Sequence, residues 1–131
     1  MRTRPRLTAH QLAILKVLWA RGEATVPEVQ HAISEDSPPA LTTVATQLSR
    51  LARRGIVGYR VQGRQYVYRA LLTESAARAD ALGELTERHF EGDIATLVSQ
   101  LLSSRDVRRG DLARVKALIE AKERELKGSR S

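Results

Sequence analysis

Residues 42–69 read TTVATQLSRLARRGIVGYRVQGRQYVYR, and their pattern is the most informative about the fold class. Residues 42–54 predict a short helix, because their apolar side chains recur at spacings of three and four, and Gly55 follows as a left-handed cap. From Val57 onward apolar and aromatic residues alternate instead, and Gln62-Gly63 supplies a turn between two alternating runs. That pattern predicts a two-stranded β-hairpin directly after the helix.

The residues before this stretch predict two further helices, each with its own start signal. Thr8 and Gln11 form the capping-box pattern of a first helix, which Gly22 ends. Thr25 and Glu28 form the same pattern for a second, shorter helix. The apolar face of the first helix is expected to consist of Leu12, Leu15, Leu18 and Trp19. Three closely spaced helices followed by a hairpin indicate a winged helix-turn-helix.

The fold class expected for the whole chain is therefore mainly α with a small β-hairpin. We expect a winged helix-turn-helix domain over residues 1–72, a helical dimerisation region over 73–127 and a disordered tail over 128–131. A region as small as 73–127 would bury too little apolar surface to be stable alone, and pairing of two copies would solve this. Packing of its apolar stripes on the chain's own N-terminal domain is the alternative. The residues expected at the dimer interface are Leu82, Leu85, Phe90, Ile94, Leu97, Val98, Leu101, Leu112, Val115, Leu118 and Ile119.

The charge of the chain is concentrated in its first half. The formal net charge is +7, and residues 1–72 hold 11 Lys and Arg against 4 Asp and Glu. Residues 73–131 hold 11 of each kind. This asymmetry indicates that a polyanion contacts the first half alone.

The helix over residues 42–54 has an exposed face without Asp or Glu. At about 100° per residue, its apolar side chains gather on one side, and short hydroxyl residues followed by arginines gather on the other. This order suits a helix that enters the major groove of DNA with its N-terminal end, while the hairpin contacts the backbone. The alternative is an ordinary surface helix, whose polar face is exposed to solvent and binds nothing. The residues expected to contact DNA are Thr42, Thr43, Thr46, Gln47, Arg50, Arg53, Arg54, Arg60 and Arg64.

Tyr59, Tyr66 and Tyr68 can share one face of the hairpin. For Tyr59 and Tyr66, packing onto the helices is favoured over a contact with DNA. Arg64 at the hairpin tip is favoured over Arg69 as a backbone contact.

Other functional classes find little support. The chain has no cysteine, which excludes disulfides, thiolate metal sites and a cysteine nucleophile. His10, His31 and His89 are scattered, and no phosphate-binding loop or nucleophile motif is present, so we expect no enzyme, no metal and no cofactor. No apolar stretch is long enough to span a membrane, so a cytoplasmic location is expected. A winged helix used only for protein contacts is the remaining alternative to DNA binding.

The sequence resembles the BlaI/MecI/CopY family of bacterial repressors over about residues 7–126. The positions that carry the resemblance are Leu12-x-x-Leu15-x-x-Leu18-Trp19, Thr25-Val26-x-Glu28-Val29, Thr42-Thr43-Val44-x-Thr46-x-Leu48-x-Arg50-Leu51, Arg54-Gly55, Arg64-x-Tyr66-x-Tyr68, Phe90-x-Gly92 and Leu97-Val98. The resemblance implies a dimeric repressor that binds palindromic double-stranded operator DNA. The helix over 42–54 would read the major groove, and residues 73–126 would pair two copies.

The family also implies two routes of release. One is cleavage in the C-terminal region, triggered by a membrane metalloprotease sensor, and the other is copper sensing through C-terminal cysteines. Because this chain has no cysteine, the copper route is excluded. Where beta-lactam-responsive members carry an Asn-Phe cleavage site, this chain has Gln100-Leu101, which departs from the cleaved pattern.

Overall fold

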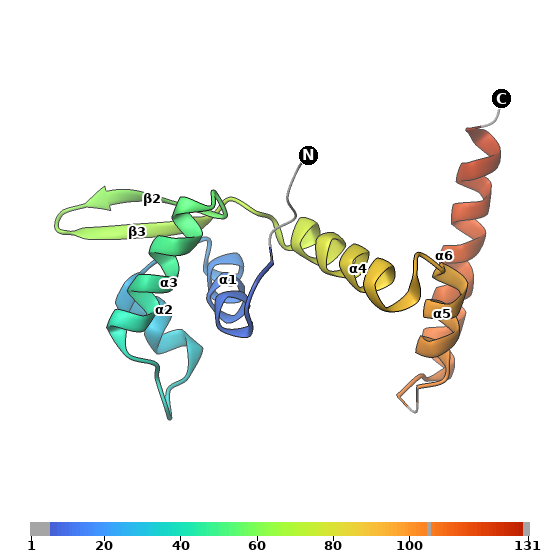
Figure 1. Cartoon of the computed structure of the whole chain (residues 1–131), viewed down its shortest axis with the longest axis horizontal. Coiled ribbons are helices and arrows are strands. Elements are labelled where there is room, and N and C mark those ends of the chain that lie inside the picture. The colour runs from blue at the N-terminus through green and yellow to red at the C-terminus, as the bar shows by residue number, and fades with distance from the viewer. Residues whose placement is uncertain (1–5, 105, 130–131) are drawn as a thin grey trace. The chain divides into compact units, whose positions relative to one another are not determined.

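The structure is a computed structural model that describes residues 6–104 and 106–129. The chain forms two compact units, residues 1–84 and residues 85–131. The first unit contains the helices α1 (Ala9–Arg21), α2 (Val26–Ile33) and α3 (Leu41–Arg53), the strands β1 (Glu23–Thr25), β2 (Val57–Gln62) and β3 (Gln65–Ala70), and the start of α4 (Glu74–Phe90). Three helices followed by the β2–β3 hairpin confirm the winged helix-turn-helix (Figure 1).

Both expected capping boxes are present. The Thr8 hydroxyl accepts a hydrogen bond from the Gln11 backbone N–H, and the Gln11 side chain accepts one from the Thr8 backbone N–H, both at 3.1 Å. Thr25 and Glu28 make the equivalent pair at the start of α2. These reciprocal bonds satisfy N–H groups that a helix start would otherwise leave unpaired, which fixes where α1 and α2 begin.

The end of α3 is a Schellman motif. Gly55 has a φ of +74° and its N–H donates to the Ala52 carbonyl, while the Ile56 N–H donates to the Leu51 carbonyl. Ile56 and Leu51 are both buried, which supplies the apolar contact that usually accompanies this motif. The motif turns the chain sharply from α3 into β2, so the hairpin starts next to the helix that precedes it.

The sheet has three strands, one more than the sequence predicted. The strand order is β1-β3-β2, and all neighbours are antiparallel. Ala24 of β1 lies opposite Tyr68 of β3. A strand of three residues carries no alternating pattern of its own, and β1 exists because β3 offers it a partner. The predicted hairpin is confirmed, and β1 is an additional strand that the sequence did not reveal.

The hairpin turn lies one residue later than expected. Gln62 pairs with Gln65, so the two loop residues are Gly63 and Arg64 rather than Gln62 and Gly63. Gly63 has a φ of +65°, which glycine adopts at little cost, and a glycine at the first of two loop positions is typical of a type II′ turn. Arg64 therefore lies at the tip of the hairpin.

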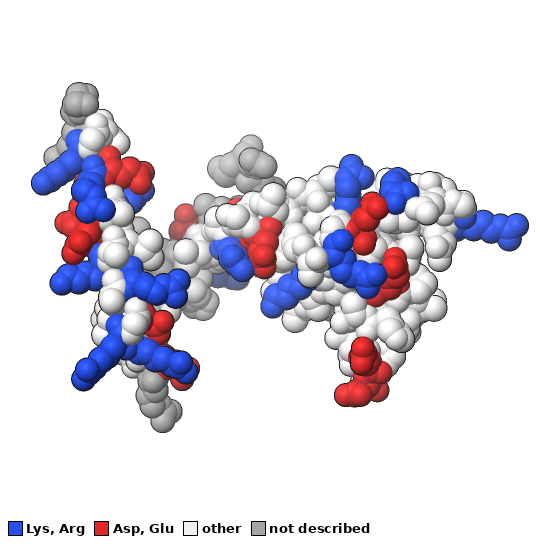
Figure 2. Space-filling model, turned by 180° about the vertical axis from the view of Figure 1, so that it is seen from behind, with Lys and Arg blue, Asp and Glu red and all other residues white. Residues whose placement is uncertain are grey.

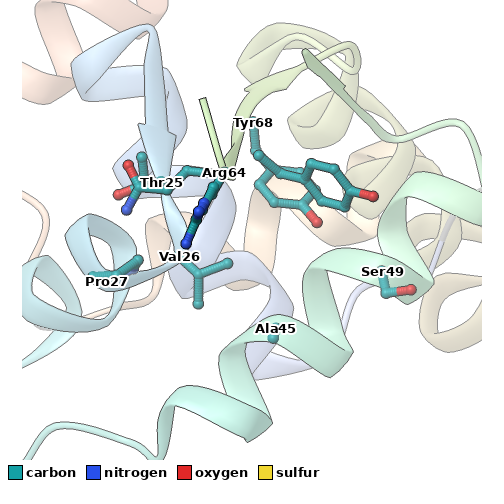
Figure 3. A pocket seen from close by; sticks show the side chains of 9 residues that line it. Thr25, Val26, Pro27, Ala45, Ser49, Arg64 and Tyr68 are labelled. Atoms are coloured by element: carbon teal, nitrogen blue, oxygen red, sulfur yellow. The ribbon is translucent and has the colours of Figure 1, made fainter. Parts of the chain in front are cut away.

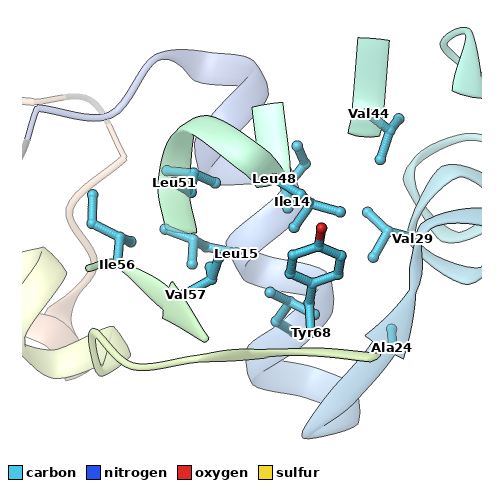
Figure 4. Packing of buried hydrophobic residues seen from close by; sticks show 11 residues of the cluster. Ile14, Leu15, Ala24, Val29, Val44, Leu48, Leu51, Ile56, Val57 and Tyr68 are labelled. Atoms are coloured by element: carbon cyan, nitrogen blue, oxygen red, sulfur yellow. The ribbon is translucent and has the colours of Figure 1, made fainter. Parts of the chain in front are cut away.

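The core of the first unit lies between the three helices and the sheet (Figure 4). It consists of Ile14, Leu15, Leu18, Ala24, Val29, Val44, Leu48, Leu51, Ile56, Val57 and Tyr68. Ile14 was missed in the sequence, and Leu12 is only half-buried. The buried side of α1 is therefore rotated from the expected stripe towards Ile14 and Gln11. At the end of this helix Trp19 packs on the core, and its Nε1–H donates to the Leu72 carbonyl at 2.9 Å.

The second unit contains the end of α4 together with α5 (Ile94–Leu102) and α6 (Arg109–Gly128). The Asp93 carboxylate caps α5, accepting from the Thr96 backbone N–H at 3.3 Å. The compact units divide within α4, whereas the sequence placed the boundary at residue 72. An ion pair between Arg6 and Glu84 at 2.9 Å links α4 to the N-terminal residues of the first unit.

The expected tail over residues 128–131 is only partly described. α6 continues to Gly128, and Ser129 is its C-cap, so these two residues belong to the helix end. Residues 130 and 131 lie outside the described residues. Among the helices of the described part, none combines the length and the apolar composition that a membrane span requires.

Candidate nucleic-acid interface

The two faces of α3 differ in chemistry. Val44, Leu48 and Leu51 are fully buried, so they fix the rotation of the helix against the core. The opposite face is polar, and its first turn contains no acidic residue. The exposed residues of α3 and its C-cap that the sequence assigned to DNA are Thr42, Thr43, Thr46, Arg50, Arg53 and Arg54. The structure therefore brings these residues together on one surface, with hydroxyl groups at the start and guanidinium groups at the end.

The N-terminus of α3 differs from those of α1 and α2. The N-cap residue is Ala40, which has no side-chain oxygen, and no side chain caps the helix. The first backbone N–H groups of a helix are unsatisfied within the helix and carry its positive end. These groups lie at the end of α3 that would enter a groove of DNA, where they are suited to contact the anionic phosphate backbone of DNA.

Gln47 is half-buried at the margin of this surface. Its Oε1 accepts a hydrogen bond of 3.0 Å from Nε2 of Gln11 on α1. Gln11 was expected only to cap a helix, and sequence reasoning did not connect it with Gln47. No sequence signal could have done so, because the two residues are 36 positions apart and meet only in the packed fold.

Arg64 lies at the hairpin tip, where the sequence expected it to meet DNA. The hairpin and α3 form the walls of an open pocket of about 430 Å³ (Figure 3). Ala45 and Ser49 line it from α3, and Arg64 and Tyr68 line it from the hairpin. Ser49 of α3 and the wing-tip Arg64 thus border the same hollow of the first unit.

Arg60 has a partner within the protein. Its guanidinium donates to both carboxylate oxygens of Glu23, at 2.7 and 3.2 Å, and to Gln62 at 2.7 Å. These bonds hold the pKa of Glu23 below its ordinary value and raise the pKa of Arg60. In the strand register Arg60 lies opposite Val67, on the sheet face other than that of Tyr68. Arg60 is therefore less available to DNA than Arg64.

Three tyrosines share one face of the hairpin, as the sequence indicated. Tyr68 is buried in the core, whereas Tyr59 and Tyr66 are 48% and 50% exposed. The rings of Tyr59 and Tyr66 lie 4.6 Å apart between centroids. Tyr59 and Tyr66 thus pack on each other and on Tyr68, while their packing onto the helices, which the sequence favoured, stays a prediction.

Figure 2 shows the charge of the two units from behind. Lys and Arg side chains project at the hairpin end of the first unit, while basic and acidic side chains both cover α6. This agrees with a basic first half and a balanced second half. Within residues 6–104 and 106–129, no group of three or more His, Asp or Glu side chains is placed to hold a metal ion.

The second unit exposes most of its large apolar side chains in a single chain. Of the residues expected at a dimer interface, Leu97 is buried and Phe90, Val98 and Val115 are half-buried. The exposed ones are Leu82, Leu85, Ile94, Leu101, Leu112, Leu118 and Ile119.

Comparisons of the chain with known proteins agree on one family. The family model described as penicillinase repressor matches residues 7–121. A penicillinase repressor of Bacillus licheniformis is 25% identical over 104 residues, which are 79% of this chain and 81% of the relative. The solved DNA binding domain of the repressor BlaI is 29% identical with a TM-score of 0.50, and the match covers 58% of this chain and 93% of that one.

A complex structure of hsRosR covers 94% of this chain and 95% of its own, at 18% identity and a TM-score of 0.56, and shows a likeness of fold alone. The resemblance seen in the sequence is thus confirmed over most of its length. Because the family model spans nearly the whole described chain, this protein belongs to the penicillinase repressor family.

Proposed function

We propose that this protein is a dimeric, sequence-specific DNA-binding transcriptional repressor that acts on operator DNA in the cytoplasm. The observation that carries the proposal is the exposed face of α3, which bears hydroxyl, amide and guanidinium groups and no carboxylate. A solvated helix face usually mixes both charge signs, whereas a face of donors and cations matches base edges and phosphates. Family membership supports the same function.

The geometry suggests a division of labour across the interface. α3 would enter the major groove with its N-terminal end, so that Thr42, Thr43 and Thr46 lie nearest the base edges. Arg50 is the arginine on the exposed face nearest to that end, and guanine edges are the commonest targets of arginine. Arg53, Arg54 and the wing-tip Arg64 would contact phosphates. Arg60, which is paired with Glu23, would contribute least.

The second unit would pair two copies. Its α5 and α6 expose Ile94 by 67% and Leu118 by 69%, and monomeric proteins seldom leave large apolar patches in water. A second copy is the favoured cover, because a symmetric dimer matches the two halves of a palindromic operator.

DNA binding is tested by titrating the full-length protein with its own upstream region at increasing salt. We expect the logarithm of affinity to fall linearly with the logarithm of salt concentration, since each neutralised phosphate releases counterions. An unrelated duplex of equal length serves as the control and should bind more weakly. If no duplex binds even at low salt, DNA binding is refuted and a protein-interaction module becomes the better reading.

Arg50→Ala and Arg64→Ala should have different effects. Loss of a base contact should weaken the preferred operator by about 1–3 kcal/mol and reduce discrimination at one base position. Loss of a phosphate contact at Arg64 should weaken all duplexes alike and lower the salt slope by roughly one. Binding of a panel of single-base operator variants measures both. Equal, sequence-independent losses for the two variants would exclude base reading by Arg50.

Release by a membrane metalloprotease sensor is a further part of the proposal, and α5 sets a condition on it. Gln100-Leu101 lies inside the helix Ile94–Leu102, so its backbone is hydrogen-bonded rather than extended. Cleavage there would require α5 to open first. Incubation with a nonspecific protease should therefore leave this bond intact until the second unit unfolds.

A further inference from the structure

Gln11 is the one polar or charged side chain among residues 6–104 and 106–129 that is buried, with 6% of its surface exposed. Burying an amide is costly unless its donor and acceptor both find partners. Its Oε1 accepts from the Thr8 backbone N–H at 3.1 Å, and its Nε2 donates to Gln47 Oε1 at 3.0 Å. Gln11 therefore links the cap of α1 to the margin of α3.

The direction of this chain of hydrogen bonds is fixed by its backbone end. A backbone N–H can only donate, so the Gln11 atom that faces Thr8 must be the carbonyl oxygen. The other end of the same amide must then be the NH₂ group, which can only donate. Its partner on Gln47 must be the acceptor Oε1 rather than Nε2. The orientation of the Gln47 amide thus follows from the capping box of a different helix.

The consequence concerns the NH₂ group of Gln47. In the described part of the chain, the buried side-chain nitrogen or oxygen without a hydrogen-bond partner is His10 Nε2. Gln47 Nε2 also has no partner there, but it is not a buried atom, so it is accessible to solvent. Gln47 also continues the exposed row of α3 that contains Thr43, four residues before it, and Arg50, three residues after it. It therefore turns its oxygen towards α1 and its N–H groups outward.

We propose that Gln11 is a positioning residue that fixes the orientation of the Gln47 amide, so that its NH₂ group is presented to DNA as a hydrogen-bond donor. This inference rests on the proposed DNA-binding function. The partner would be a hydrogen-bond acceptor of the duplex, either a phosphate oxygen or a base-edge acceptor such as guanine O6 or N7.

The chain of hydrogen bonds from Thr8 through Gln11 to Gln47 is called the relay below. Gln11→Glu tests the relay without disturbing the cap of α1. A glutamate at this position still accepts from the Thr8 N–H, since a hydroxyl residue followed three positions later by glutamate is also a capping box. The introduced carboxylate cannot donate to Gln47. The Gln47 amide should therefore reverse, donate to the carboxylate and present its oxygen to DNA.

The effect on DNA binding is measured in two steps. Wild type and Gln11→Glu first select their preferred sites from a random duplex library, and their affinities for a fixed panel of duplexes are then measured at one salt concentration. If Gln47 meets a base, preference at one position should shift by about fivefold from an acceptor-bearing guanine edge to the amino group of adenine or cytosine. If Gln47 meets a phosphate, every duplex should weaken by about fivefold without a change in preference. Either result supports the relay.

Two control variants separate the relay from a simple charge effect. Ala9→Glu adds the same charge to the first turn of α1, at a position that is exposed and makes no hydrogen bond to Gln47. The effect of Gln11→Glu must exceed that of Ala9→Glu and must vanish when Gln47→Ala is also present. Equal effects of the two glutamate variants, or an effect that persists with Gln47→Ala, would overturn the proposal.

Side-chain amide NMR of the free full-length protein tests the orientation independently of DNA. In the wild type, the NH₂ protons of Gln11 should exchange slowly and those of Gln47 rapidly. Gln11→Glu should slow the exchange of the Gln47 protons. The opposite pattern refutes the orientation, whereas the expected pattern in a protein that binds no duplex shows that the proposed function itself has failed.

Discussion

At the scale of single residues, polar pairs decide which basic groups of the first unit remain available to a ligand. Arg60 and Arg64 lie on the same hairpin, and the sequence offered both as DNA contacts. Only Arg60 lies beside a carboxylate, that of Glu23 on the neighbouring part of the sheet. Glu23 belongs to β1, the strand that the sequence did not reveal, so the pairing could not be foreseen.

The pair makes a pH-dependent contribution to stability. Arg60 holds the pKa of Glu23 below its ordinary value of 4.5, so the carboxylate stabilises the fold fully above about that pH. The contribution is lost as the pH falls through the lowered pKa of the folded state. The difference in unfolding midpoint between wild type and Glu23→Gln should therefore be greatest near neutrality and shrink below pH 4.5.

Urea unfolding at a series of pH values measures this difference. Arg60→Gln should give the same pH profile, because it removes the other half of the pair. A difference that stays constant down to the acid limit would show that the pair does not shift the Glu23 carboxyl.

At the scale of elements, α3 combines structural and binding roles on opposite faces. Its buried face was foreseen correctly, because spacings of three and four place Val44, Leu48 and Leu51 on one side whatever the partner. Leu48→Ala should lower the free energy of unfolding by about 2–5 kcal/mol, since it removes a fully buried side chain and leaves a cavity. Leu41→Ala, on the same helix but 46% exposed, should change it by less than about 0.5 kcal/mol.

Chemical denaturation of both variants measures these free energies. Similar losses at the two positions would mean that α3 does not pack with the rotation seen here.

The end of α3 could also be predicted from the sequence, because the cap at Gly55 and Ile56 depends on residues that are close together in the chain. The start of α3 at Ala40 has no such signal, and it was placed only approximately from the sequence.

At the scale of the whole molecule, the second unit exposes apolar surface that its own helices do not cover. Leu118→Glu should dissociate a dimer held by this surface, because a charge buried at an apolar interface is strongly unfavourable. Ala117→Glu adds the same charge to α6 on the side away from the apolar stripe and should leave the dimer intact. Sedimentation velocity over a range of protein concentrations distinguishes the two. Identical behaviour of both variants would place the interface elsewhere.

Features that depend on neighbouring residues could be predicted from the amino-acid sequence. Caps, helical spacing, strand alternation and the Gly63 turn are local, so they indicated the winged helix-turn-helix to within a residue or two. Which distant groups meet is visible in the folded chain alone. It paired Glu23 with Arg60, added β1 to the sheet and joined Gln11 to Gln47, because such contacts depend on how packed elements are rotated against one another. The packing of the whole core sets that rotation, so no single segment of the sequence predicts it.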